Sequence, residues 1–117
     1  MDKQSLGKYG EDLVCTHLKK NGFTIAERNF RFRYGEIDII AQKDGLTAFV
    51  EVKTRQSDAF GSPAEAVGAR KQKSILLAAQ QYISLKGKPD ENYTFDVAEV
   101  LIREGVPAIN YIQNAFC

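Results

Sequence analysis

The sequence predicts an α/β fold, a mixed β-sheet with helices packed on it, and two observations lead to that class. Apolar residues recur at helical spacing near the N-terminus and again after residue 62, and the remaining segments read as strands. The resulting order is helix, three strands, helix and two strands, which suits a sheet covered by helices. With 117 residues and no repeat or linker, we expect one domain spanning residues 1–117.

The first helix is expected to begin after Ser5, as its N-cap, and to end at Asn21-Gly22, where the glycine favours a left-handed C-cap. Two glycines lie inside this helix, Gly7 and Gly10. They allow either a close approach of the backbone to nucleic acid or tight packing on the sheet, and the sequence leaves both open.

Three strands follow the first helix. They are predicted over Phe23 to Phe32, Glu36 to Gln42 and Thr47 to Thr54. Arg33-Tyr34-Gly35 is expected to turn the chain between the first two, and Lys43-Asp44-Gly45 is a tight hairpin signal between the second and third.

The second helix is expected to start with a capping box at Ser62-Pro63-Ala64-Glu65 and to run to about Leu85, with a weak point at Gly68. Two further strands are predicted over Thr94 to Ile102 and Ala108 to Ile112.

Composition and charge exclude several classes of protein. Hydrophobic residues make up 44% and charged residues 26% of the chain, the balance of an ordinary globular protein. No apolar run approaches the roughly 18 residues that cross a bilayer, so no membrane association is expected. Two cysteines, Cys15 and Cys117, are too few for a disulfide framework, which favours a reduced, cytoplasmic setting. The net charge of +1 gives no general argument for nucleic acid.

The third strand carries charge where a central strand is usually apolar. Because side chains reverse face at each residue, Phe49, Glu51 and Lys53 share one face of this strand, opposite its alanine and valines. In the second strand, the same alternation places Ile37 and Ile39 on one face and Asp38 on the other. The short hairpin then allows Asp38 to lie beside Glu51 in the sheet.

Two neighbouring carboxylates repel each other unless a proton or a cation joins them. Mg²⁺ takes one or two carboxylates together with waters and phosphate oxygens, and Asp38 and Glu51 would supply such a shell; Mn²⁺ can substitute for it. Glu11, at the edge of the apolar stripe of the first helix, could reach the same cleft. Lys53 would contact the attacking water or a phosphate oxygen. An ordinary surface ion pair between Glu51 and Lys53 is the alternative, and it stays open.

A basic stretch from Lys19 to Arg33 holds five basic residues against one acid, with aromatic residues among them. Such a stretch can follow a phosphate backbone, although on this segment alone an edge strand that resists aggregation is favoured. The candidates for nucleic-acid contact over the whole chain are Arg31, Arg33, Arg55 and Lys71.

Two of these candidates have equally good alternatives. Arg55 could pair with Glu51 or Asp38 instead of a phosphate. Lys71 lies within an apolar helix stripe and could extend its ammonium to solvent.

A resemblance adds to this pattern. Asp38 followed by Glu51-Val52-Lys53 resembles the PD-(D/E)xK restriction-endonuclease-like superfamily. A longer set of strings resembles the YraN-like family over almost the whole chain: Gly10-Glu11, Glu27-Arg28-Asn29, Gly35-Glu36-Ile37-Asp38, Phe49 to Arg55, Ala64-Glu65-Ala66-Val67 with Lys71, Phe95-Asp96-Val97 and Asn114-Ala115-Phe116.

The resemblance implies a single restriction-endonuclease-like domain, a mixed sheet flanked by helices as in archaeal Holliday-junction resolvases. It implies Glu11, Asp38, Glu51 and Lys53 as the catalytic positions, with the three acids as metal ligands. The expected activity is Mg²⁺-dependent endonucleolytic hydrolysis of DNA, with branched or repair intermediates as candidate substrates and a homodimer as a candidate assembly. The alternative is a non-catalytic nucleic-acid-binding module with a vestigial nuclease site.

Overall fold

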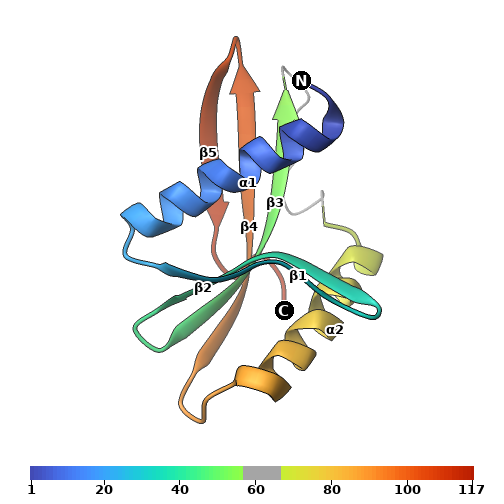
Figure 1. The fold of residues 1–117 in the computed structure, drawn as a ribbon, viewed down its shortest axis with the longest axis vertical. Helices are drawn as coiled ribbons and strands as arrows, with labels where there is room; N and C mark the ends of the chain where they lie inside the picture. The colour runs from blue at the N-terminus through green and yellow to red at the C-terminus, as the bar shows by residue number, and fades with distance from the viewer. Residues whose placement is uncertain (57–66) are drawn as a thin grey trace.

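The structure, a computed structural model, describes residues 1–56 and 67–117. Its elements are α1 (Lys3–Lys20), β1 (Thr24–Phe32), β2 (Gly35–Lys43), β3 (Leu46–Gln56), α2 (Ala69–Lys86), β4 (Asn92–Arg103) and β5 (Val106–Ile112). The strands form one five-stranded sheet in the order β1-β2-β3-β4-β5 (Figure 1). β3 and β4 run parallel, and every other neighbouring pair is antiparallel. The predicted class, a mixed sheet flanked by helices, is confirmed and is consistent with a restriction-endonuclease-like fold.

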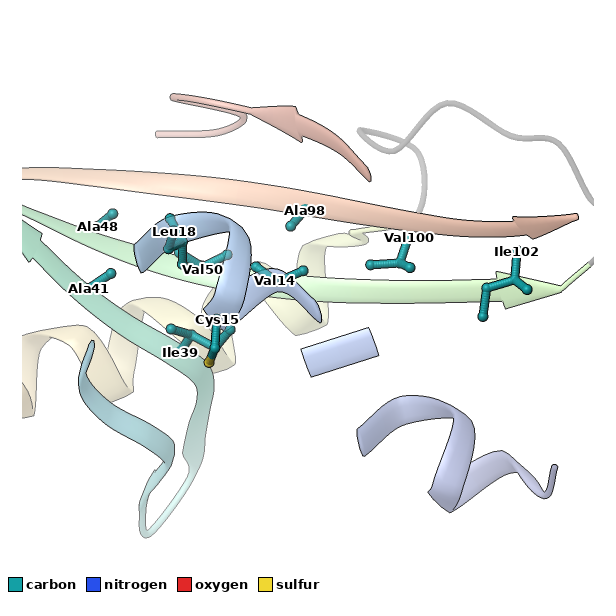
Figure 2. Close-up of a cluster of buried hydrophobic side chains, with 10 residues drawn as sticks. All are labelled: Val14, Cys15, Leu18, Ile39, Ala41, Ala48, Val50, Ala98, Val100 and Ile102. Carbon is teal, nitrogen blue, oxygen red and sulfur yellow. The ribbon is translucent and has the colours of Figure 1, made fainter. Parts of the chain in front are cut away.

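The two helices cover opposite faces of the sheet. In Figure 1, α1 crosses in front of β3 and β4, and Figure 2 shows Val14, Cys15 and Leu18 of this helix against side chains of the sheet. On the other face, Ile75, Ala78, Ala79 and Tyr82 of α2 pack on a second cluster that includes Ile37, Ile40, Phe49 and Val97. Full burial of one large apolar side chain contributes roughly 1.5–3 kcal/mol, so these two layers hold the helices on the sheet.

The N-terminal ends of both helices differ from the expectation, whereas their C-terminal ends agree with it. Asp2, not Ser5, is the N-cap of α1: its carboxylate accepts a hydrogen bond of 2.7 Å from the Ser5 backbone N–H. A carboxylate is a good cap because it also complements the partial positive charge of a helix N-terminus. Helix α2 begins at Ala69 with Gly68 as N-cap, so the expected continuation of the helix through Gly68 is wrong. The predicted capping box at residues 62–65 lies outside the described residues.

Gly10 sets how closely α1 approaches β3. A Cβ on Gly10 would overlap the side-chain hydroxyl of Thr54, whereas a Cβ on Gly7 would meet nothing within 4 Å. Of the two roles left open by the sequence, Gly10 therefore serves packing on the sheet. Because Glu11 follows directly, this close approach also fixes where the Glu11 carboxylate lies.

We expect Gly10→Ala to destabilise the protein by about 1–3 kcal/mol, because the added methyl group must displace α1 or Thr54. Urea denaturation followed by circular dichroism measures this change. Gly7→Ala is the matched control: it should stabilise the protein by about 0.5–1 kcal/mol through helix propensity. Equal effects of the two substitutions would contradict the packing role of Gly10.

Candidate functional site

The site begins where β2 leaves β3. The ladder between these strands runs from Lys43–Leu46 to Ile39–Val50, and the next residue of β2, Asp38, has no partner in it. Beyond this point no strand in the described part of the chain pairs with the β2-facing edge of β3, and the Asp38 carboxylate instead accepts a 2.8 Å hydrogen bond from the Val52 backbone N–H. We call this place the fork. It brings Asp38 to the part of β3 that carries Glu51.

The fork also overturns one face assignment. Ile39 packs in the cluster beneath α1, whereas Ile37 packs in the cluster beneath α2, so these residues lie on opposite faces and not on one. Asn29 of β1, opposite this part of β2, has a φ of 52°, a left-handed conformation that interrupts a regular strand. Strict alternation fails because the backbone turns as the two strands separate.

Glu51 is a buried carboxylate with one unsatisfied oxygen. The residue is 3% exposed, and its Oε1 has no hydrogen-bond partner among residues 1–56 and 67–117. Its Oε2 lies 3.6 Å from the Lys71 ammonium and 3.9 Å from that of Lys53. Because Phe49 packs beneath α2 and Lys71 belongs to that helix, the expected common face of Phe49, Glu51 and Lys53 is the α2 face.

The electrostatics of Glu51 follow from this position. Burial first, then the negative charge of Asp38, and then a hydrogen bond between the two carboxyl groups raise the pKa of Glu51 to about 8; Lys71 and Lys53 oppose the shift. A buried carboxylate beside another carboxylate takes up a proton unless a cation replaces it. At neutral pH the pair Asp38 and Glu51 therefore holds either a proton or a cation.

Glu11 reaches the fork from the α1 side. Burial, and then the charge of Asp38, raise the pKa of Glu11, while Arg28 and Asn29 of β1 counteract the rise. Arg28 lies 3.7 Å from Glu11 Oε1 and 2.8 Å from Asp12 Oδ1, so it ties α1 to β1 at this point. Glu11 and Glu51 thus approach Asp38 from opposite faces of the sheet.

These acids fit a metal ion in part. Within residues 1–56 and 67–117, no three histidine, cysteine, aspartate or glutamate side chains converge closely enough to hold one ion. Asp38 and Glu51 alone match the one or two carboxylates that Mg²⁺ usually takes. The unpartnered Glu51 Oε1 is an oxygen of the kind that such an ion binds. Glu11 as a third ligand stays a prediction.

A basic cleft of about 700 Å³ opens beside Glu11. Its lining combines the start of α1 with β1: Lys3, Gln4, Gly7, Lys8, Glu11, Arg28, Asn29 and Arg31. Four of these side chains carry positive charge and one carries negative charge, a balance that attracts phosphate groups.

The four residues expected to contact nucleic acid lie at separate places in the structure. Arg31 lines the basic cleft, and Arg33 lies beyond it in the turn between β1 and β2. Lys71 lies at Glu51. Arg55 lies 3.8 Å from Glu99 of β4, a partner that was not among its predicted ones.

Sequence reasoning did not assign a role to Arg28 and Asn29. Both belong to the segment Glu27-Arg28-Asn29, but the residue types of that segment do not indicate the contact of Arg28 with α1. The contact depends on the β-bulge between Ile25 and Glu27, which shifts the register of β1 against β2.

Comparisons with known proteins agree with one another. Residues 10–100 match the model of a family described as "Uncharacterised protein family UPF0102". A "UPF0102 protein" of Syntrophomonas wolfei subsp. wolfei is 45% identical over 113 residues, 97% of this chain and 98% of that protein. Another of Alkaliphilus metalliredigens is 47% identical over 113 residues, with the same coverage. A third, of Dictyoglomus thermophilum, is 42% identical over 118 residues, 99% of this chain and 100% of that protein. Among the described residues, no helix is long and apolar enough to span a membrane.

The raised pKa of Glu51 predicts a pH dependence of stability in the presence of a chelator. The native state keeps the proton of Glu51 up to about pH 8, whereas the unfolded chain loses it near pH 4.5. The native state therefore binds the extra proton between these values, and the free energy of unfolding contributed by Glu51 falls as pH rises across this window.

Thermal denaturation in EDTA at several pH values between 4.5 and 8 measures this effect. The difference in Tm between Glu51→Gln and the wild type should shift in favour of the variant as pH rises. Glu36→Gln, which alters a more exposed carboxylate paired with Arg31, is the control and should show no such shift. A pH-independent difference for Glu51→Gln would contradict the assignment.

Proposed function

The chain belongs to the UPF0102 family, and we propose that it is a Mg²⁺-dependent endonuclease of the PD-(D/E)xK restriction-endonuclease-like superfamily that hydrolyses phosphodiester bonds of DNA. The expected YraN-like resemblance is confirmed at the level of this family. The nuclease activity, the metal, the DNA partner and a cytoplasmic location are parts of the proposal.

One observation carries the proposal: the buried Glu51 has an unpartnered Oε1 beside the Asp38 carboxylate. The ion pairs with Lys53 and Lys71 involve Oε2 and leave Oε1 unsatisfied, and an unsatisfied buried acceptor costs about 1–3 kcal/mol. A divalent cation bound by Asp38 and Glu51 would satisfy that oxygen and remove the repulsion between the two carboxylates.

The side chains around this pair suit phosphodiester hydrolysis. A bound Mg²⁺ would acidify a coordinated water and neutralise charge that develops on the phosphate. Lys53 and Lys71, about one-third exposed, can move their ammonium groups from Glu51 to a non-bridging phosphate oxygen. The basic cleft beside Glu11 would hold the neighbouring phosphates.

A second candidate is a nucleic-acid-binding module with a vestigial site. The two lysines at Glu51 favour it, because they partly neutralise this carboxylate without a metal ion. The module would bind nucleic acid through the same cleft, and its binding would be unaffected by a chelator.

A cleavage assay separates the two candidates. Branched, single-stranded and duplex DNA are incubated with Mg²⁺, Mn²⁺ or EDTA, and we expect cleavage only with metal. Asp38→Asn, Glu51→Gln and Lys53→Ala should each reduce the rate by about a hundredfold or more, because each removes a group that acts on the reacting phosphate. Glu104→Gln, in the exposed β4–β5 turn, is the control.

Calorimetric titration of the free protein with Mn²⁺ gives a second readout that does not depend on turnover. We expect a heat of binding that Asp38→Asn and Glu51→Gln abolish and that Glu104→Gln keeps. Binding of DNA in EDTA, unchanged in these variants and without cleavage under any condition, would support the vestigial-site module and contradict the nuclease.

A homodimer is also part of the proposal. The described residues supply one pair of metal-binding carboxylates per chain, and a two-fold dimer would present two such sites to the two strands of DNA. Sedimentation velocity with and without DNA should show a species of twice the monomer mass. A monomer under both conditions would contradict the dimer, but it would not contradict the proposed cleavage of one DNA strand by each chain.

A further inference from the structure

The turn between β1 and β2 exposes aromatic side chains away from both clusters of the core. Tyr34 is 79% exposed and Phe32 is 38% exposed. They flank Arg33, whose φ of 26° marks the tight turn of this hairpin. A large, exposed aromatic residue at the tip of a hairpin contributes little to folding, so its exposure needs another explanation.

These side chains line a groove of about 530 Å³ against α2, which we call the hairpin groove. Its lining residues are Arg31, Phe32, Arg33, Tyr34, Gly35, Glu36 and Ser74. A Cβ on Gly35 would collide with the backbone of Ser74 and Ala78, so the hairpin lies directly on α2 at this point. In Figure 1 the β1–β2 hairpin projects alongside the first half of α2. Helix α2 therefore forms one wall of the hairpin groove.

The charge of the hairpin groove favours an anion next to the aromatic rings. Arg31 lies 3.6 Å from Glu36, and both side chains are accessible to solvent. Arg33 forms no ion pair with any acid in residues 1–56 or 67–117. An exposed pair of this kind contributes little to stability, so a phosphate could take Arg31 from Glu36 at small cost.

The hairpin groove continues into the proposed nuclease site. Arg31 lines both this groove and the basic cleft that contains Glu11. On the α2 side, Lys71 lies one helical turn before Ser74 and reaches Glu51. A strand with its phosphates on Arg31 and Lys71 would thus pass the fork and arrive at the aromatic side chains.

We propose that the hairpin groove binds an unpaired base, stacked on Tyr34 and Phe32, so that the substrate class of the proposed nuclease is a nucleic acid with a single-stranded segment next to the cleaved bond. This inference rests on the proposed function. It adds a site that binds an unpaired base and so distinguishes single-stranded segments from duplex. The occupant is a base because the groove combines exposed ring faces with arginines, the combination that holds single strands. In a duplex, the neighbouring bases already cover both faces of each base, which leaves none for Tyr34.

The test measures stacking apart from cleavage. The adenine analogue 2-aminopurine is placed at each position of a single-stranded overhang in turn, and its fluorescence is recorded with the full chain in EDTA. We expect quenching at one or two overhang positions. Tyr34→Ala should abolish the quenching and weaken binding of the overhang oligonucleotide about tenfold or more, while Tyr34→Phe should retain both, because stacking needs the ring and not the hydroxyl.

Controls use the same oligonucleotides. Val106→Ala changes an apolar residue that is 68% exposed in a different hairpin of the sheet, between β4 and β5, and should leave quenching and affinity unchanged. A fully paired duplex should bind equally to the wild type and Tyr34→Ala. Because Tyr34 is largely exposed, its replacement should not unfold the protein, and circular dichroism checks this.

Several results would overturn the inference. The first is that Tyr34→Ala loses affinity equally for the duplex and the overhang, and the second is that it loses affinity for neither. The third is an oligomer in sedimentation that Tyr34→Ala alone disrupts, which would make the groove an interface between copies of the chain. Metal-dependent cleavage that disappears in Glu51→Gln but shows no preference for unpaired substrates would keep the nuclease and reject the stacking site. Quenching that Tyr34→Ala abolishes, without cleavage by any variant, would keep the stacking site and reject the nuclease.

Discussion

The separation of β2 from β3 at Asp38 is the constraint on which the rest of the site depends. It leaves an unpaired backbone N–H on β3, and an unpaired buried donor costs about as much as a lost hydrogen bond. The Asp38 carboxylate supplies the missing acceptor at Val52. The same separation opens a route between the two faces of the sheet, so that α1 and α2 can each contribute a charged side chain to one place.

Burying the Glu51 carboxylate destabilises the folded state, and the neighbouring lysines offset this only in part. Glu51 is almost fully buried; its Oε2 lies near Lys53 and Lys71, whereas its Oε1 has no hydrogen-bond partner within the described residues. An apolar residue on this face would extend the cluster around Phe49 and avoid the desolvation penalty. A carboxylate that weakens the native state in the absence of a ligand is the arrangement expected at a binding or catalytic site.

The sequence was sufficient for the fold class, the order of the elements and the approach of Asp38 to Glu51, because hydrophobic periodicity, turn residues and a short hairpin determine all three. It was insufficient where tertiary contacts override local rules. Ile37 changes face because the strands separate, and Arg28 reaches α1 because of a bulge. Both Asp2 and Ser5 are residue types that cap helices well, so the sequence did not determine which of them is the N-cap. Because α1 begins at Lys3, the N-cap is Asp2. The aromatic residues of the hairpin could be read from the sequence, but their exposure on α2 could not.

The balance of charge at the fork bears on how a metal ion and a phosphate would bind. Four acids, Glu11, Asp12, Asp38 and Glu51, face three bases, Arg28, Lys53 and Lys71, so the group carries one negative charge when all are ionised. A phosphodiester adds a second negative charge. A proton on Glu51 would balance only one of the two, whereas a divalent cation at its free oxygen would balance both. The cation would also act on the negative charge that develops in the transition state.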